Sequence, residues 1–248
     1  MISKNQIKFI RQLELKKCRH REGLFVAEGT KVVNDLLDHY RPRMLFATRE
    51  FLNTHPLSDG EVIEITDDEL QRISFQQHPQ QVLALFPIPA PADPRPHLES
   101  RLTLALDSVQ DPGNLGTIIR IADWFGIDTI ICSIDTVDAW NPKVVQATMG
   151  SLARVNIIYL DLPAFLDQLP AQFPVYGTFL DGDDIYQQTL SPTGLIVMGN
   201  EGNGISEAVR QRINRRLLIP SFRQNDTADS LNVAIATAIT CSEFRRVR

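Results

Sequence analysis

The sequence has few cysteines, no clustered histidines and no long apolar segment, and each shortage excludes a class of protein. Its three cysteines, Cys18, Cys132 and Cys241, are far apart and form no metal-ligand pattern, which indicates reduced thiols. The longest apolar runs, such as residues 195–198, are far shorter than the roughly 20 residues that a membrane span needs. The start, MISKNQIKFIRQ, lacks the apolar core of a signal peptide. We therefore expect a cytoplasmic protein with no membrane segment and no metal.

The composition is that of an ordinary globular chain. Hydrophobic residues make up 43% and charged residues 22% of the sequence, so a sizeable core is available. The formal net charge of -5 by itself argues mildly against a nucleic-acid partner. Positive charge is nevertheless concentrated at the start, in Lys4, Lys8, Arg11, Lys16, Lys17, Arg19 and Arg21. This basic stretch is a candidate phosphate-binding face, although charge alone favours a solvated helix surface.

A proline-rich segment divides the chain. PIPAPADPRPH, from Pro87 to His97, has five prolines in eleven residues, which cannot continue a helix or a central strand. Such a segment suits an extended spacer. We place a first domain at residues 1–86, a linker at residues 87–100 and a second domain at residues 101–248.

The two domains differ in their patterns. The first predicts a small α/β unit, with a basic amphipathic stretch at residues 7–17, a helix at 31–39 and strands at 24–29, 44–48, 61–66 and 81–86. The second predicts strands at 102–107, 129–133, 155–160, 175–180, 195–199 and 216–220, with helices at 114–125, 142–149, 163–169, 206–212 and 230–245. Apolar strands that alternate with helices indicate a parallel sheet covered on both faces.

Three loops of the second domain follow strands, where parallel α/β sheets bind ligands. In the first, Asn114 is expected to cap the next helix and Arg120 to lie about one and a half turns further along, near the cleft. The second, GNEGNG, is rich in glycine, which lets a backbone approach a ligand closely. Its glycine order matches neither a dinucleotide-binding nor a phosphate-binding loop. In the third, Asp229 or Ser230 is expected to cap the closing helix. Each loop alone also has an ordinary structural explanation.

Together and in this order, the loops resemble the three motifs of the SpoU (TrmH) branch of the SPOUT methyltransferases. DPGNLGTIIRIADWFG resembles motif 1, VMGNEGNGIS motif 2, and IP followed by DSLNVAIA motif 3. The resemblance covers residues 101–248, and KVVQATMGSLARVNI is similar to the family's stretch between motifs 1 and 2. The basic start and FVAEGTKVV resemble the family's ribosomal-protein-like substrate-binding domain.

The resemblance implies a fold and an activity. The fold is α/β, with the C-terminal part of a parallel sheet tied in a deep trefoil knot, which general rules of chain connection would not predict. The family resemblance also implies a homodimer whose interface lies beside the cofactor site. The cofactor is S-adenosylmethionine, and the reaction is methylation of a ribose 2′-hydroxyl, a group that distinguishes RNA from DNA. The substrate-binding domain favours ribosomal RNA over transfer RNA.

The family's site positions can be carried over residue by residue. The polar active-site positions are matched by Asn114, Arg120, Glu201, Ser230 and Asn232. The candidate cofactor-binding residues are Thr178, Met198, Gly199, Asn200, Gly202, Ile219, Pro220, Ser230 and Leu231. Because an arginine side chain stays protonated at neutral pH, we expect Arg120 to hold the hydroxyl and a phosphate rather than act as a base. Relatives carry a glycine in a shorter loop where SFRQNDTAD stands here, so we expect altered substrate contacts.

Other functions stay open at this point. A non-catalytic RNA-binding protein on the same fold predicts loss of Asn114, Arg120 and Asn232, all of which are present. A knotted methyltransferase that acts on a base or a protein calls for other motif residues. A nucleotide-binding α/β enzyme is disfavoured by the glycine order. A transfer-RNA substrate remains the alternative to ribosomal RNA.

Overall fold

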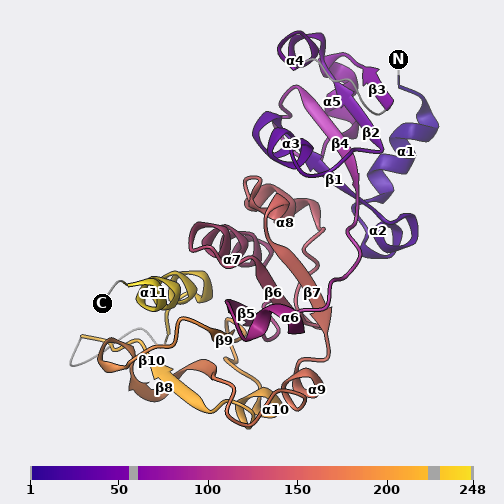
Figure 1. Cartoon of the computed structure of the whole chain (residues 1–248). Coiled ribbons are helices and arrows are strands. Elements are labelled where there is room, and N and C mark those ends of the chain that lie inside the picture. Colours follow the sequence, from indigo (N-terminus) through magenta and orange to yellow (C-terminus); the bar gives the residue numbers. More distant parts are fainter. Residues whose placement is uncertain (1, 56–60, 223–229, 247–248) are drawn as a thin grey trace. The chain divides into compact units, whose positions relative to one another are not determined.

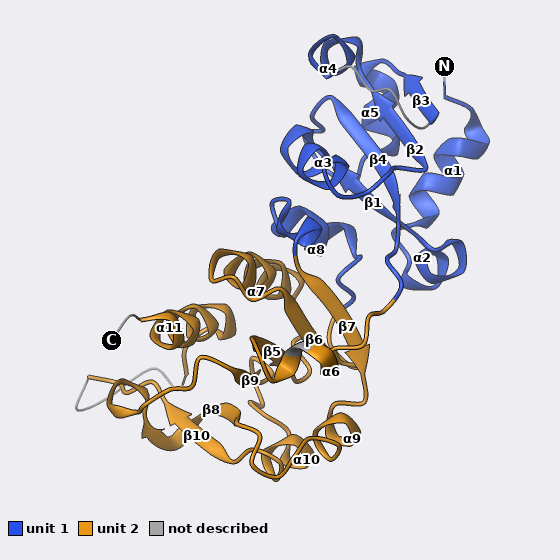
Figure 2. Cartoon of the chain, viewed as in Figure 1, with its two compact units in different colours: residues 1–90, 138–154 blue, residues 91–137, 155–248 orange. Residues whose placement is uncertain are grey.

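The chain forms two compact units. The structure is a computed structural model that describes residues 2–55, 61–222 and 230–246 (Figure 1). Unit 1 contains residues 1–90 and 138–154, and unit 2 contains residues 91–137 and 155–248 (Figure 2). Residues 138–154 therefore cluster with the start of the chain, although they lie within the predicted second domain. The predicted boundaries at residues 86 and 100 stay a prediction.

Unit 1 is an α/β unit in which a sheet has the order β1-β4-β2-β3 among the described residues. Strand β4 is antiparallel to β1 and β2, whereas β2 and β3 are parallel. Its elements are α1 (Lys4–Gln12), α2 (Lys16–Glu22), β1 (Leu24–Glu28), α3 (Thr30–Leu37), β2 (Met44–Ala47), α4 (Arg49–Thr54), β3 (Glu61–Glu64), α5 (Asp67–Ile73), β4 (Val82–Pro87), α8 (Pro142–Ala147) and η1 (Ser151–Ala153). The basic amphipathic stretch at residues 7–17 runs from α1 into the start of α2, and the turn after Gln12 places Leu13 in the core beside Ile10.

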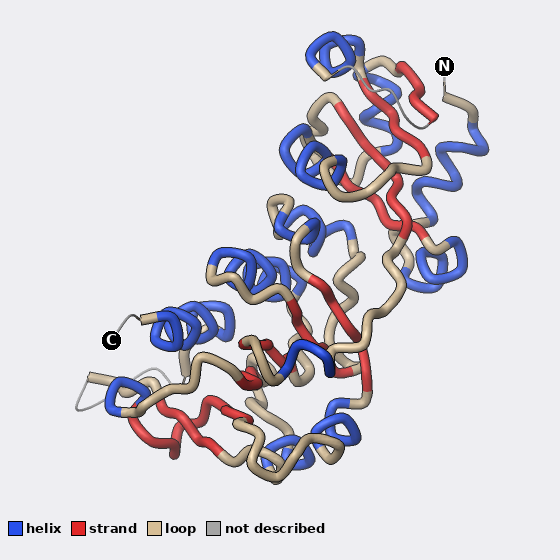
Figure 3. Tube along the Cα trace, viewed as in Figure 1, coloured by secondary structure: helices blue, strands red, loops and turns tan. Residues whose placement is uncertain are grey.

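Unit 2 contains the predicted parallel sheet, in the order β10-β8-β9-β5-β6-β7, with every pair parallel. Its elements are α6 (Arg95–Leu98), β5 (Leu102–Leu106), α7 (Pro112–Trp124), β6 (Thr129–Ser133), β7 (Asn156–Leu160), α9 (Leu162–Leu166), β8 (Val175–Asp184), η2 (Ile185–Gln187), β9 (Gly194–Met198), α10 (Glu207–Arg210), β10 (Arg215–Leu218) and α11 (Val233–Arg245). Figure 3 shows these strands and helices along the chain.

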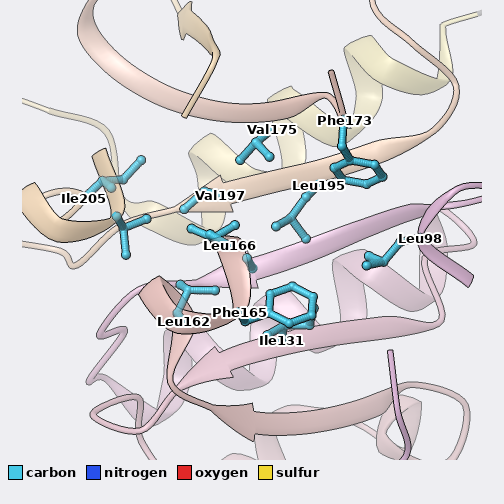
Figure 4. Close-up of a cluster of buried hydrophobic side chains, with 12 residues drawn as sticks. Leu98, Ile131, Leu162, Phe165, Leu166, Phe173, Val175, Leu195, Val197 and Ile205 are labelled. Atoms are coloured by element: carbon cyan, nitrogen blue, oxygen red, sulfur yellow. The ribbon is translucent and has the colours of Figure 1, made fainter. Parts of the chain in front are cut away.

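Apolar side chains of the strands and helices form the core of unit 2. Ile131, Leu195 and Val197 on central strands are fully buried and pack with Leu162 and Phe165 of α9 (Figure 4). The three-residue run from Leu195 to Val197 is buried on both sides of the strand, as expected for a parallel sheet covered on two faces. This core holds the ends of β5, β8 and β9 in fixed positions.

Two of the predicted helix caps beside the motifs, Asn114 and Ser230, are wrong. Asp111, not Asn114, caps α7, and its Oδ1 accepts a hydrogen bond of 2.7 Å from the main-chain N–H of Asn114. Pro112 occupies the first helical turn, where proline costs no hydrogen bond, so the helix begins earlier than predicted. Asn232, not Ser230, caps α11 and accepts from the main chain of Ala234 at 2.9 Å. The other predicted cap, Asp229, lies outside the described residues.

Other predictions differ from the structure in detail. The proline-rich segment contains the short helix α6, because Pro96 stands in the first turn, where proline is tolerated. Strand β8 continues past the predicted end at Leu180 to Asp184. None of the helices in the described part of the chain has the length and apolar composition of a membrane span. The trefoil knot stays a prediction.

Candidate functional site

A cavity of about 660 Å³ lies in unit 2, among residues within β8 and residues at and after the ends of β9 and β10. This volume is in the range of about 300–1,000 Å³ that is usual for sites of small organic ligands. All the residues predicted to bind the cofactor line the cavity, namely Thr178, Met198, Gly199, Asn200, Gly202, Ile219, Pro220, Ser230 and Leu231. The sheet therefore gathers three distant segments around one space.

The cavity also has walls that the sequence did not indicate. Phe179, Leu180 and Asp181 extend one wall, and Arg210 and Val233 come from α10 and α11. In the sequence, only their position directly after Thr178 could have indicated that Phe179, Leu180 and Asp181 line the cavity. Arg210 had no signal, because it lies on a short helix outside the three motifs.

The turn after β9 is closely packed, which explains one of its glycines. A Cβ atom on Gly199 would lie 2.3 Å from the carbonyl carbon of Gly204, so no side chain fits there. The main chains of Asn200 and Gly204 exchange hydrogen bonds of 2.9 and 3.0 Å. The Asn200 side-chain oxygen also accepts from the main chain of Gly202, at 2.9 Å. These bonds hold the turn in one shape beside the cavity.

The cavity suits a ligand with a heterocycle. Met198, Ile205 and Leu218 supply apolar walls. The main chain also borders the cavity at Ile219 and Leu231, which stand between β10 and α11, outside the regular strands and helices. Apolar walls with main-chain groups beside them are what an adenine ring requires. The residues present therefore fit S-adenosylmethionine.

A chain of polar side chains joins the three motifs at one side of the cavity. Asn232 Nδ2 donates to Asn114 Oδ1 at 2.9 Å, and Asn114 Nδ2 donates to Glu201 Oε1 at 3.1 Å. The Glu201 carboxylate also accepts from the main-chain N–H groups of Gln110 and Asp111, at 3.3 and 3.2 Å. Glu201 thus ties the loop after β5 to the turn after β9. Three of the five predicted active-site residues are brought together.

The other two predicted active-site residues have different positions. Ser230 lines the cavity. Arg120 lies on α7, is exposed and is absent from the cavity wall. Its guanidinium has no hydrogen bond or ion pair within the described part of the chain, so it is available to an outside partner. Among the described residues, no hydrogen bond or ion pair joins Arg120 to the Asn114–Glu201 pair.

The basic start of the chain is exposed at six of the seven predicted RNA-binding positions, namely Lys4, Lys8, Arg11, Lys16, Lys17 and Arg21. Arg19 is the exception, because its residue is only 1% exposed and its guanidinium pairs with Asp138. It also donates to the carbonyls of Leu13 and Glu14, at 2.8 and 2.7 Å. Arg19 therefore does not belong to an exposed basic face, because its charge is already neutralised inside unit 1.

No group of three or more potential metal ligands occurs among the residues that the structure describes. The cysteines Cys18, Cys132 and Cys241 are all buried free thiols. Burial raises the pKa of the Cys241 thiol to about 12 and also raises that of Cys132. These thiols are therefore neutral core groups rather than nucleophiles.

The parallel sheet and the cavity where the three motifs meet are those of a SpoU-type methyltransferase, and the comparison with known families agrees. The SpoU rRNA Methylase family matches residues 101–242, and an MRM3-like substrate binding domain matches residues 4–84. The chain belongs to the SpoU rRNA methylase family.

Similar proteins match along nearly the whole length. The 23S rRNA (guanosine(2553)-2′-O)-methyltransferase RlmP of Bacillus subtilis is 32% identical, over 98% of this chain and 97% of its own. A solved structure of a TrmH-family protein from Porphyromonas gingivalis superimposes with a TM-score of 0.91 and 46% identity, covering 99% of this chain and 98% of that one. The structure of an AdoMet-bound rRNA methyltransferase from Sinorhizobium meliloti superimposes with a TM-score of 0.85 and 33% identity, covering 99% of this chain and 96% of that one.

Proposed function

We propose that this chain is an S-adenosylmethionine-dependent methyltransferase that methylates a ribose 2′-hydroxyl of ribosomal RNA. The observation that carries the proposal is one cavity lined by all the predicted cofactor residues, with the Asn114–Glu201–Asn232 chain beside it. Relatives that match over nearly their full length are named as 23S rRNA 2′-O-methyltransferases, which favours ribosomal RNA over transfer RNA. The cofactor-bound relative from Sinorhizobium meliloti supports the choice of cofactor.

The chemistry of the cofactor determines which roles are left to the residues of the chain. When bound, S-adenosylmethionine supplies a methyl group that its sulfonium makes strongly electrophilic. The chain's own task is then to hold and orient the attacking hydroxyl. The Glu201 carboxylate fixes the Asn114 amide, and Asn114 in turn fixes Asn232. The exposed guanidinium of Arg120 holds the hydroxyl and an adjacent RNA phosphate.

Substitution of Arg120 tests this assignment. We expect Arg120→Ala to abolish transfer of a tritiated methyl group to ribosomal RNA, while the calorimetric Kd for S-adenosylmethionine stays within about twofold, because Arg120 does not line the cavity. Arg215→Ala is the matched control, since Arg215 is an exposed arginine of the same unit that also lies outside the cavity wall. Full activity of Arg120→Ala would remove the residue from the mechanism. Failure of the wild-type chain to bind the cofactor would end the whole proposal.

We also propose that two copies of the chain associate beside the cavity. Helices α7 and α11 pack together, and their outer faces expose Trp124 at 85% and Ile235 at 53%. Large exposed apolar side chains of this kind favour a protein contact. Light scattering should give twice the mass of 28.0 kDa for the wild type and the monomer mass for Trp124→Asp/Ile235→Asp. A monomeric wild type would contradict the proposal.

The basic face of unit 1 is proposed to hold the RNA backbone. Lys4, Lys8 and Lys17 are exposed lysines of α1 and α2. Because each neutralised phosphate steepens the salt dependence of binding, changing all three to glutamine should weaken RNA binding and flatten that dependence. Changing Lys31, an exposed lysine that already pairs with Asp35, is the control. An unchanged salt dependence in the triple variant would place the RNA elsewhere.

The remaining proposals concern organisation and location. We infer a substrate-binding domain at residues 1–86, a linker at 87–100 and a methyltransferase domain at 101–248. The family matches, which end at residue 84 and begin at residue 101, support these boundaries. A cytoplasmic location is supported by three cysteines that are all free thiols. Disulfide formation in the protein isolated from cells would argue against that location.

A further inference from the structure

One wall of the cavity is made by a part of β8 that leaves the sheet. Strand β10 pairs with β8 at Gly177 and then, after a register shift, at Asp183. Residues 178–182, which we name the β8 excursion, are therefore outside this ladder. Four of them, Thr178 to Asp181, line the cavity. The ladder cannot hold this wall in position, so other contacts must do so.

Where the excursion rejoins the sheet, it lies directly on β10. A Cβ atom on Gly182 would be 2.5 Å from the main-chain carbonyl carbon of Leu217, so no side chain fits between the two strands. The end of the excursion is thus anchored by close packing. Its middle, from Phe179 to Asp181, is held by side-chain contacts.

Two arginines hold the middle of the excursion. Arg210 of α10 pairs with Asp181 Oδ2 at 3.0 Å, and Arg216 of β10 pairs with Asp181 Oδ1. Both guanidinium groups also lie against the Phe179 ring, at 4.8 and 4.4 Å from its centroid. The Arg216 guanidinium holds the pKa of Asp181 below its usual range, so the carboxylate is charged at neutral pH. We name Asp181, Arg210, Arg216 and Phe179 the wall cluster.

In the wall cluster, the carboxylate of one residue links three separate elements. Asp181 belongs to β8, whereas its two partners come from the short helix α10 and from β10. Arg210 and Asp181 themselves line the cavity, but Arg216 does not. Arg216 therefore does not contact a ligand in the cavity directly, but it contacts the two wall residues Asp181 and Phe179.

We propose that the wall cluster positions the β8 excursion and so sets the affinity for S-adenosylmethionine, with Asp181 and Arg216 acting as positioning residues rather than catalytic ones. This inference rests on the proposed function, because it takes the cavity to be the cofactor site. If the wall is already ordered before the ligand binds, the free energy of binding is not reduced by the entropy cost of ordering it. Loss of the cluster should weaken cofactor binding and leave the chemical step unchanged.

The sign of the Arg216 effect separates this proposal from simple electrostatics. S-adenosylmethionine carries a positively charged sulfonium. If Asp181 only attracted that charge, Arg216→Gln would leave more negative potential at the cavity and tighten binding. Because the cluster instead orders the wall, we expect Arg216→Gln and Asp181→Ala both to weaken binding, on the order of threefold to tenfold. The reaction product S-adenosylhomocysteine, whose sulfur is uncharged, should also bind these two variants more weakly, by a similar factor.

The experiment is calorimetric titration of the full-length variants with both compounds, followed by steady-state methylation of RNA. We expect the KM for the cofactor to rise in Asp181→Ala and Arg216→Gln with kcat unchanged, and Asp181→Glu to recover most of the affinity. Asp183→Ala is the matched control, since Asp183 is an exposed aspartate of the same strand whose carboxylate has no hydrogen bond or ion pair among the described residues. Asp167→Ala breaks a comparable exposed pair, with Arg212, away from the cavity.

Each result decides between the alternatives. Cofactor affinity of Asp181→Ala equal to that of Asp183→Ala would overturn the inference while leaving the proposed function intact. Tighter binding by Arg216→Gln would also overturn it, in favour of direct attraction. Weaker RNA binding by Arg216→Gln with unchanged cofactor affinity would instead make the cluster a phosphate contact. A wild-type chain that binds neither compound would overturn the inference and the proposed function together.

Discussion

Glu28, at the end of β1, is a carboxylate inside unit 1 and only 5% exposed. It accepts hydrogen bonds from the Ser74 hydroxyl and, at 2.9 Å, from the main-chain N–H of Phe75. Burial raises its pKa above the usual range, although these bonds and the nearby Arg11 oppose the shift. The residue therefore links protonation to the stability of the folded chain.

A first prediction concerns the pH dependence of that stability. Because the pKa of Glu28 is higher in the folded than in the unfolded state, the folded chain binds more protons, and its stability falls as pH rises from the ordinary glutamate pKa through the raised one. We expect Glu28→Gln to remove this fall. Urea-induced unfolding at a series of pH values between about 4 and 8 measures it.

Glu69 provides the contrast for this measurement. It accepts hydrogen bonds from the main-chain N–H groups of Thr66 and Ile2, which lower its pKa. Its contribution is therefore present above the ordinary glutamate pKa and is lost as pH falls. Glu69→Gln should change the acid side of the stability profile in the opposite direction. The same profile for both variants would contradict the assignment of Glu28.

Asn232 serves two elements at once. Its Oδ1 caps α11 by accepting from the main chains of Ala234 and Ile235, at 2.9 and 3.2 Å. Its Nδ2 donates to Asn114, at the start of α7. One amide thus begins a helix and continues the polar chain that ends at Glu201. The two roles can be separated by substitution. The cap needs only the side-chain oxygen as an acceptor, whereas the bond to Asn114 needs the side-chain N–H as a donor.

A second prediction follows at this scale. Asn232→Ala should lower the free energy of unfolding by about 1 kcal/mol, the usual effect of losing a helix N-cap, and should also reduce methyl transfer. Asn232→Asp keeps the acceptor, so its stability should match the wild type, whereas its methyl transfer should fall because the donor to Asn114 is lost. Thermal unfolding and tritium transfer measure the two effects.

Ser206 is a suitable control for the cap. It precedes α10, but its side chain makes no cap hydrogen bond there. Ser206→Ala should therefore leave the unfolding temperature nearly unchanged. If Asn232→Asp lost as much stability as Asn232→Ala, the capping role of Asn232 would be wrong.

At the scale of the whole molecule, one buried ion pair joins sequence segments that are far apart. Arg19 and Asp138 are 119 residues apart, and both are almost fully buried. In the same unit, Trp140 packs on Phe25 with ring centroids 4.9 Å apart, and Gln146 accepts a hydrogen bond of 2.8 Å from Gln76. These contacts explain why residues 138–154 belong to unit 1.

A third prediction tests this pair. Arg19→Met leaves the Asp138 carboxylate buried without its partner, so the unfolding free energy of unit 1 should fall by about 3–5 kcal/mol. The double variant Arg19→Met/Asp138→Leu should recover much of that loss, because no unpaired charge remains. Urea unfolding followed by Trp140 fluorescence, in a Trp124→Phe background, measures both variants. A loss under about 1 kcal/mol in the single variant would mean that water reaches Asp138.

Much of the fold could be predicted from local patterns. Apolar runs such as Leu195 to Val197 predict buried strands, and the structure has a strand at each predicted position in both units. The boundaries of helices were harder to predict than the strands. Asp111 and Asn114 are both residue types that cap helices, and only the position of Pro112 decides between them. Short helices such as α4 and α5 were missed because they span few turns.

The order of the motifs, the glycine-rich turn and the basic start were all determined by the sequence alone, since each depends on residue type and spacing within a short segment. Only the tertiary structure decided that Asn114, Glu201 and Asn232 form one hydrogen-bonded chain. It also decided that Arg19 is buried and that Asp181, which lines the cavity, pairs with Arg216. The physical reason is that burial and pairing depend on which distant segments the sheet brings together, and no local spacing carries that information.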